Sequence, residues 1–137
     1  MILSQSAKYA LRATIYLADH GEGPHLSREI AEALDVPAQY LAKILQDLAR
    51  HGLLISAKGR GGGFRLAQPA DQIVLLRVVR AIDGERFGEG CALGLPDCSD
   101  EAPCALHGAW KELKGEILGM LENTNLSDLP RASPLVH

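Results

Sequence analysis

The sequence predicts a mainly α-helical protein with one small β-hairpin, organised as a winged helix-turn-helix followed by a long C-terminal helix. Three observations lead to this fold class: two short amphipathic segments joined by a tight turn, a glycine-rich hairpin after them, and an apolar stripe at helical spacing near the C-terminus. The 137 residues suffice for one modest core with an appended helix. Hydrophobic residues make up 47% and aromatic residues only 4%, so we expect an aliphatic core.

The first two helices are delimited by breaking and capping residues. Apolar residues recur at helical spacing over residues 6–20, and Gly21 and Gly23 then end this helix. Ser27 can cap a second, short helix, which ends at the turn of residues 35–37.

A third helix is expected from near Pro37 to Gly52, with Leu41, Ile44, Leu45 and Leu48 on its inner face. Small and polar side chains that fit a DNA groove lie on the outer face: Ala38, Gln39, Ala42, Lys43, Gln46 and Arg50. Tyr40 can add a phosphate contact near the helix start. A solvated helix face would explain any one of these residues, but helix, turn and basic hairpin together indicate DNA binding.

The hairpin is predicted from a strand over residues 53–57, a glycine-rich turn over 58–63 and a returning strand over 64–66. Arg60 is the best candidate for insertion into the minor groove. The glycines open no helix and no glycine-lysine-serine/threonine ending follows, so a nucleotide-binding loop is not predicted. The DNA-binding candidates are Ser27, Ala38, Gln39, Tyr40, Lys43, Arg50, Lys58, Arg60, Gly61 and Arg65.

The charges are segregated along the chain. The net charge of −3 argues at first sight against a nucleic-acid partner. Up to Ile82, however, ten basic residues oppose seven acidic ones, whereas after Ile82 four oppose ten. Between Lys43 and Arg65 five cations face the single acid Asp47, so a polyanion could dock there.

An apolar helix over residues 74–81 should end at Asp83 and Gly84. The C-terminal helix then carries an apolar stripe formed by Leu106, Trp110, Leu113, Ile117, Met120 and Leu121. This stripe is too apolar to stay in water, so the helix needs a partner. Gly115 and Gly119 would permit close helix approach, and no apolar run is long enough to span a membrane.

The chain has three cysteines, Cys91, Cys98 and Cys104, and His107 follows the last of them closely. An odd number of thiols cannot close as intramolecular disulfides, and no secretory signal is evident, so we expect a reducing, cytoplasmic compartment. Three thiolates and one imidazole suit an iron-sulfur cluster or zinc. The wide intervals favour a cluster, while three reduced thiols in a loop remain the simpler alternative.

The opening Ser-x-Lys-Tyr-Ala-Leu-Arg, the segment at Tyr40 and Leu41, the Gly-Arg-Gly-Gly-Gly-Phe-Arg-Leu hairpin of residues 59–66 and the three-cysteine loop resemble the IscR/NsrR-type family of bacterial winged-helix regulators. The resemblance implies a homodimer formed through the C-terminal helix and a double-stranded, pseudo-palindromic DNA operator. It implies a winged-helix domain over residues 1–84, a cluster loop over 85–104, a dimerisation helix over 105–124 and a tail over 125–137.

Within this resemblance, Cys91, Cys98 and Cys104 match the three cluster thiolates and His107 matches the histidine ligand of the iron-sulfur-biogenesis regulators. Nitric-oxide-sensing relatives use a carboxylate from the N-terminal helix of the other subunit, where this chain has Lys8. Six residues separate Cys91 from Cys98, where the usual family pattern has five. A [2Fe-2S] cluster is favoured and a [4Fe-4S] cluster is the alternative, with Asp97, Asp100 and Glu101 as substitute ligands.

The expected function is a transcriptional regulator, a repressor, whose operator affinity depends on a cluster that senses iron, nitric oxide or redox state. Two alternatives remain: a cluster-free thiol or zinc regulator, and an iron-sulfur carrier or electron-transfer protein. An enzyme is not expected, because no acid that would orient a Cys104–His107 pair and no substrate pocket is evident.

Overall fold

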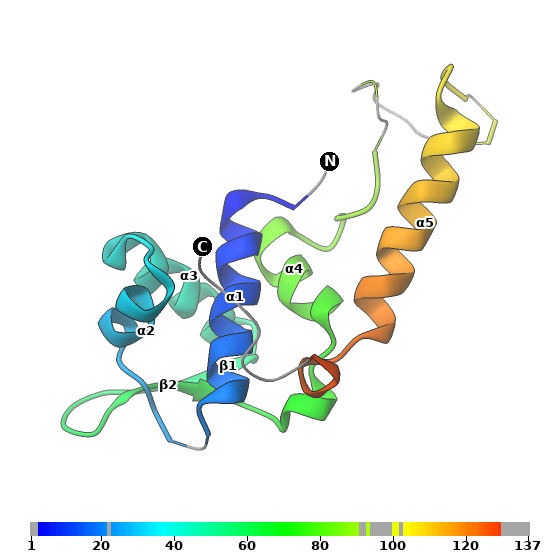
Figure 1. The fold of residues 1–137 in the computed structure, drawn as a ribbon. Coiled ribbons are helices and arrows are strands. Elements are labelled where there is room, and N and C mark those ends of the chain that lie inside the picture. Colours follow the sequence, from blue (N-terminus) through cyan, green and yellow to red (C-terminus); the bar gives the residue numbers. More distant parts are fainter. Residues whose placement is uncertain (1–2, 22, 91–92, 94–99, 102, 130–137) are drawn as a thin grey trace.

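The computed structural model describes residues 3–21, 23–90, 93, 100–101 and 103–129 of the chain (Figure 1). Its helices and strands are α1 (Gln5–Asp19), α2 (Ser27–Leu34), α3 (Ala38–Arg50), β1 (Leu54–Ala57), β2 (Gly63–Leu66), α4 (Leu75–Asp83) and α5 (His107–Asn123), with short 3-10 helices η1 (Ala70–Gln72) and η2 (Leu126–Asp128). The mainly helical architecture with one antiparallel hairpin confirms the predicted fold class.

The core lies where α1, α3 and α4 meet, and α2 packs against α3. Small residues on α1 let the neighbouring helices approach closely, since Ala7, Ala10 and Ala13 are completely buried. The inner face predicted for α3 is confirmed, because Leu41, Ile44, Leu45 and Leu48 are all buried. The core is therefore aliphatic, as the composition predicts.

The helix ends differ in detail from the prediction. Ser4 caps α1, because its hydroxyl accepts a 3.0 Å hydrogen bond from the Ala7 N–H. Ser27 is not the N-cap of α2: Leu26 holds that position, without a side-chain hydrogen bond, and Ser27 is the first helical residue. Asp35 ends α2 in the left-handed conformation (φ 54°), which turns the chain into α3.

The wing consists of β1, β2 and the loop 58–62 between them, with Leu54 opposite Leu66 and Ala57 opposite Gly63. At Gly63 a β-carbon would lie 2.4 Å from the carbonyl oxygen of His25, so only glycine fits. His25 and Phe64 exchange backbone hydrogen bonds of 2.9 and 2.8 Å, which fasten the wing to the start of α2.

The C-terminal part of the described chain returns to the core. The Leu75 N–H donates to the Thr124 carbonyl, and the Leu126 N–H donates to the Ile73 carbonyl. Leu121 and Leu126 are 2% and 3% exposed. The prediction that Leu121 belongs to the dimerisation surface is therefore corrected, because this side chain is buried within its own chain. The packed structure also extends past residue 124, although a tail was predicted from residue 125 onward.

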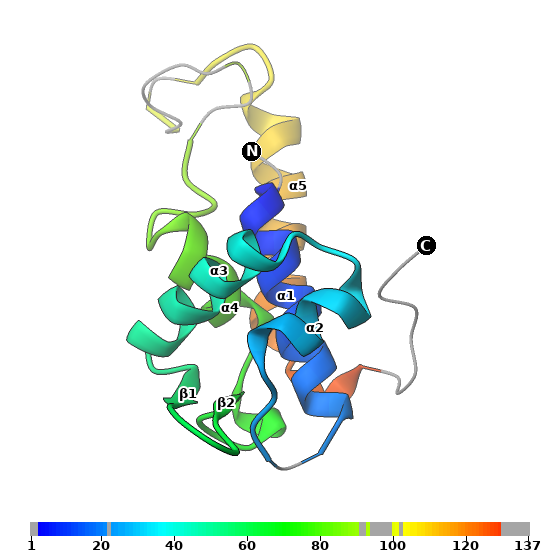
Figure 2. The same cartoon turned by 90° about the vertical axis from the view of Figure 1, so that its left-hand side faces the viewer.

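The first turns of α5 and the wing lie at opposite ends of the molecule (Figures 1 and 2). The segment after α4 runs along the side of α5 toward its N-terminus, and the N-terminal part of α5 projects beyond the helices of the core. In the described residues no helix has the length and apolar character needed to cross a membrane.

Candidate nucleic-acid interface and cysteine loop

The outer face of α3 is open to solvent. Ala38, Gln39, Lys43, Gln46 and Arg50 are exposed, and Ala42 is half-buried. Because α3 is fixed from behind by its four buried leucine and isoleucine side chains, this face is presented by a rigid element. The outer face predicted for this helix is thus accessible, and its contact with a DNA groove stays a prediction.

Two of the DNA-binding candidates on α3 also make contacts within the chain. The Tyr40 hydroxyl bonds to the Ser6 hydroxyl of α1, and the Tyr40 ring packs edge-on against Tyr9 with the centroids 5.5 Å apart. Arg50 forms an ion pair with Asp47 one turn earlier on the helix. Tyr40 is nonetheless 41% exposed, so part of the residue still faces solvent.

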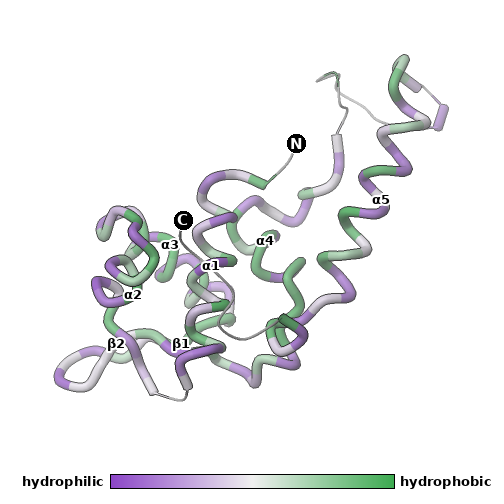
Figure 3. Tube along the Cα trace, viewed as in Figure 1, coloured by the Kyte–Doolittle hydropathy of each residue, from purple (hydrophilic) through white to green (hydrophobic). Residues whose placement is uncertain are grey.

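The wing presents cations around a tight backbone turn. Lys58, Arg60, Gly61 and Arg65 are exposed, and the Gly62 N–H closes the turn on the Gly59 carbonyl at 3.0 Å. The hydropathy tube shows hydrophilic residues within this loop (Figure 3). A β-carbon on Gly62 would lie 2.4 Å from the Ala57 carbonyl oxygen, which explains a glycine there.

Arg28 joins the wing cations, although the sequence did not single it out. It lies in the first turn of α2, and together with Arg60 it lines a hollow of about 530 Å³ between that turn and the wing. Its position one residue after the start of a helix, in the helix-turn-helix, is the signal that could have found it. The hollow brings two guanidinium groups to the side of the molecule that carries the wing.

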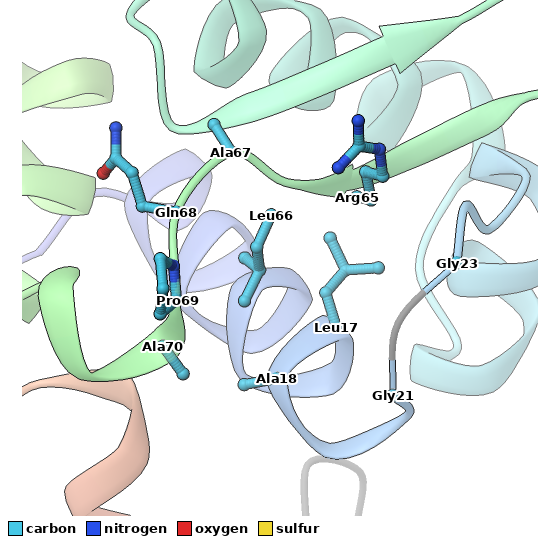
Figure 4. A pocket seen from close by; sticks show the side chains of 10 residues that line it. All are labelled: Leu17, Ala18, Gly21, Gly23, Arg65, Leu66, Ala67, Gln68, Pro69 and Ala70. Atoms are coloured by element: carbon cyan, nitrogen blue, oxygen red, sulfur yellow. The ribbon is translucent and has the colours of Figure 1, made fainter.

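A second hollow, of about 610 Å³, lies between the end of α1 and the segment that follows β2 (Figure 4). Its walls are mainly small and aliphatic, with Leu17 and Leu66 side by side and Gln68 and Arg65 to either side. Among its lining residues only these last two carry polar side chains, which is a poor set for chemistry on a substrate.

The segment that leads to the cysteines is fastened to α5. Gly88 packs against Leu118, whose side-chain carbons would lie 2.8 Å from a β-carbon at residue 88. The Trp110 indole N–H donates to the Gly90 carbonyl at 3.1 Å, and Lys114 approaches the same oxygen at 3.5 Å. Trp110 thus has a polar role that its place in the apolar stripe did not suggest.

His107, at the start of α5, is buried, which overturns the alternative of an ordinary helix-surface histidine. Its N–H donates to the Cys104 carbonyl at 3.0 Å, so the half-buried Cys104 and His107 share one turn of chain. The His107 Nε2 lies 2.8 Å from an Asp100 oxygen, and Lys111 contacts the same carboxylate at 2.8 and 2.9 Å.

These contacts favour the ionised form of Asp100. The hydrogen bond from Lys111 comes first, followed by the one from His107 and the positive charge of Lys111, and together they lower the pKa of Asp100 from 3.8 to about 2. Asp100 is exposed, so water screens the attraction.

Cys91 and Cys98 lie outside the described residues. Within the part of the chain that the structure describes, no three histidine, cysteine or acidic side chains converge as metal ligands. The described members of the predicted ligand set are Cys104 and His107.

The apolar stripe of α5 divides into two parts. Leu106, Leu113 and Met120 are 49%, 49% and 57% exposed. Ile117 is half-buried against the core and Trp110 is half-buried beside Gly90, whereas Leu121 faces the core. Figure 3 shows hydrophobic residues along the projecting part of α5.

Two short helices joined by a tight turn, an exposed polar face on the second helix and a basic wing define the winged-helix class of DNA-binding proteins. Comparison with known proteins then identifies the family. A family model described as Rrf2, iron-dependent transcriptional regulator, matches residues 3–132. The chain belongs to the Rrf2 family of transcriptional regulators, which are not enzymes.

Three relatives show how far the similarity extends. The chain is 33% identical to the HTH-type transcriptional regulator IscR of Photobacterium profundum over 132 residues, covering 96% of this chain and 76% of the relative. The structure is similar to CymR, the global cysteine regulator of B. subtilis, with a TM-score of 0.76, 26% identity, and coverage of 93% and 95%. It is also similar to T. potens IscR, with a TM-score of 0.74, 26% identity, and coverage of 93% and 85%.

Proposed function

We propose that this chain is a cytoplasmic homodimeric repressor that binds a double-stranded operator and whose affinity is set by an iron-sulfur cluster. The observation that carries the proposal is the exposed polar face of α3 beside a basic wing, with buried His107 and half-buried Cys104 at the other end of the molecule. Family membership supports the DNA-binding part.

DNA recognition is assigned to three groups of side chains. Ala38, Gln39 and Lys43 on α3 would meet base edges, with Gln39 suited to a bidentate bond with adenine. Arg60 and Gly61 at the wing tip would enter the minor groove. Phosphate contacts would come from Ser27, Tyr40, Arg50, Lys58 and Arg65, to which the structure adds Arg28.

Affinity measurements on a duplex selected by the protein from a random library test this assignment. Gln39→Ala should weaken binding to that duplex by about ten- to hundredfold, and should relax selectivity at one base pair. Lys58→Ala, at a proposed phosphate contact, should weaken binding to all sequences alike and reduce the slope of log affinity against log salt by about one. Arg86→Ala removes an exposed cation of the cysteine loop, and equal losses in this control would contradict the assignment.

The homodimer is assigned to α5. Its exposed leucine and methionine side chains lie on a projecting part of the helix. β-Carbons added at Gly108, Gly115 and Gly119 would meet no other described part of the chain within 4 Å, the backbone of α5 itself aside. A second copy of α5 could therefore approach closely and cover Leu106, Leu113 and Met120.

The proposed cluster ligands are Cys91, Cys98, Cys104 and His107. The described donors fit this role, because a ligating histidine commonly donates its other ring N–H to a carboxylate, and His107 Nε2 contacts Asp100. When bound, an iron-sulfur cluster supplies a centre whose occupancy and charge change with iron, nitric oxide or redox state. The contacts of Gly88, Trp110 and Lys114 would hold the segment before Cys91 against α5.

Spectroscopy of anaerobically purified protein tests the cluster. We expect visible absorption and circular dichroism with matching iron and sulfide, and an altered spectrum with faster cluster loss in His107→Ala. The matched control is His51→Ala, an exposed histidine at the C-terminal end of α3. A colourless protein that contains zinc or only thiols would contradict the cluster proposal.

A second candidate is a regulator whose thiols sense the signal without a cluster. The observation that favours it is the similarity to CymR, which is named as a cysteine regulator and has the higher TM-score of the two structures compared above. The same spectra distinguish the two candidates, because an iron-sulfur cluster absorbs visible light and free thiols do not.

A further inference from the structure

The first turn of α1 is bonded at one point to the end of α4 and at another to the start of α3. The Ser4 N–H donates to Asp83 Oδ2 at 3.3 Å, and the Ser4 hydroxyl donates to the other oxygen of the same carboxylate. The Ser4 hydroxyl also accepts from the Ala7 N–H, so the residue that caps α1 is held by α4. Asp83 is the last residue of α4 and directly precedes the segment that carries the cysteines.

The second attachment reaches α3 near its N-terminus. Tyr40 is the third residue of α3, and its hydroxyl bonds to Ser6. Its ring meets Tyr9 at an interplanar angle of 84°, and the Arg12 guanidinium lies 5.6 Å from the centre of the Tyr9 ring. Arg12 also donates to the Leu34 carbonyl at 2.5 Å, so α1 additionally grips the turn before α3.

We propose that this first turn of α1 is a tie by which the base of the cysteine loop positions the recognition helix of the same subunit. Asp83, Ser4 and Ser6 are then positioning residues that act on DNA through Tyr40. The inference rests on the proposed function for its signal, but the contacts that form the tie are independent of any cluster.

The tie is suited to transmit small displacements. Ser4 and Ser6 are two residues apart on one turn, so a shift of Asp83 moves both through a segment stiffened by helical hydrogen bonds. The interior behind the turn is close-packed, since Ala7 and Ala10 are fully buried, which leaves the turn little room to absorb the shift.

Hydrogen exchange in the full-length, metal-free protein tests the tie itself. The Leu41 N–H donates to the Pro37 carbonyl at 3.0 Å and reports on the first turn of α3. Asp83→Ala and Ser6→Ala should each speed exchange in residues 38–42 about threefold or more, because one hydrogen bond at either end is lost. Gln5→Ala and Asp71→Ala are controls at exposed positions and should leave the exchange unchanged.

The proposal is overturned if Asp83→Ala leaves the rate of hydrogen exchange at residues 38–42 unchanged, whatever the effect of Ser6→Ala. Tyr40→Phe keeps the ring but removes the hydroxyl. In this background Ser6→Ala should cause no further increase in the rate of exchange. An added effect of Ser6→Ala in that background would equally contradict the tie.

Measurements of operator affinity then test whether the tie takes part in regulation. In the wild type we expect different affinities for the cluster-loaded and metal-free forms, and Asp83→Ala should shrink their ratio at least threefold. An affinity ratio of one in the wild type would refute the control of DNA binding by the cluster. The hydrogen-exchange result would still decide whether the tie positions α3. An unchanged ratio in Asp83→Ala beside a clear wild-type ratio would refute the positioning role.

Discussion

At the scale of single residues, His107 shows that burial determines which partners a polar side chain needs. His107 follows Cys104 at a spacing common on helix surfaces, yet it is buried and bonded to an exposed carboxylate. Burying a polar ring without a partner costs free energy, and Asp100 removes that cost. The histidine therefore has a buried, hydrogen-bonded position at the start of α5.

The ionisation of Asp100 is the first prediction at this scale. Because the folded pKa is lowered to about 2 from 3.8, the contact contributes stability above pH 3.8 and loses it as the pH falls through the folded value. Carbon-detected NMR titration of metal-free protein should show the Asp100 carboxyl still ionised at pH 3.

Lys111→Ala should raise the pKa of Asp100 more than His107→Ala does, since the hydrogen bond from Lys111 is the largest cause. The reverse order, or a carboxyl that titrates near its usual value in the wild type, would show that the contact to α5 is absent in solution.

Gly63 gives the second residue-scale prediction. Its φ of 134° and its contact with the His25 carbonyl leave no space for a methyl group. Gly63→Ala should lower the free energy of unfolding by about 1–3 kcal/mol in urea denaturation. Gly61→Ala, with positive φ but open space around it, is the matched control and should lose less; equal losses would mean that the close approach is unimportant.

At the scale of elements, two helices with similar sequence patterns have different environments. The apolar face of α3 is fully covered within its own chain, whereas α5 keeps half of its stripe in solvent. The difference arises because α3 is surrounded by α1, α2 and α4, while α5 contacts mainly α4 along its C-terminal part. An uncovered stripe of this kind favours association between copies.

Leu113→Asp tests that association. Burial of a leucine side chain is worth about 1.5–3 kcal/mol, so its replacement by a charged residue should weaken dimerisation by about ten- to hundredfold. Light scattering combined with gel filtration over a range of concentrations measures the effect. Ile55→Asp makes the same change at another exposed apolar residue, 38% exposed on β1. A similar shift in that control would contradict an interface on α5.

At the scale of the whole molecule, the chain after α5 packs onto the head, the part of the structure from α1 to α4 (residues 3–83). The isolated bridge between Val74 and Asn125 and the buried Leu126 join the segment after α5 to the start of α4 and to the core. Asn125 forms a capping box with Asp128, which holds η2 against the core. The head and the C-terminal segment are thus expected to unfold together.

Leu126→Ala should therefore destabilise the entire head by about 2–5 kcal/mol, the usual cost of truncating a buried leucine. Urea denaturation followed by circular dichroism at fixed protein concentration measures this loss. Leu129→Ala, at a half-buried position of the same segment, should cost less. A transition that leaves the helical signal of the head unchanged would show that the segment folds separately.

Much of the fold could be predicted because its signals are local. Glycine and proline punctuation and helical periodicity place α1, α2 and α3 within one or two residues of their observed ends. The strand Leu54–Ala57 begins one residue later than predicted, because the Leu53 N–H bonds back to the Leu48 carbonyl. The predicted N-cap of α2 was wrong by one residue. Leu26 has the extended backbone of an N-cap and Ser27 is already helical, a difference that residue type does not reveal.

The candidate site was predictable in its residue types and less so in its contacts. Charge segregation and the glycine-rich hairpin indicated DNA, and the thiols with His107 indicated a metal centre. The partners of Tyr40, Trp110 and His107 come from segments 34, 20 and 7 residues away, so no spacing rule predicts them.

The sequence by itself determined the fold class, the exposed polar helix with its basic wing, and the set of candidate ligands, because these depend on periodicity and side-chain chemistry. Only the tertiary structure decided which part of the α5 stripe is covered, that residues 124–126 belong to the core, and that the first turn of α1 joins α3 to α4. Each of these depends on contacts between distant parts of the chain, whose geometry follows from packing.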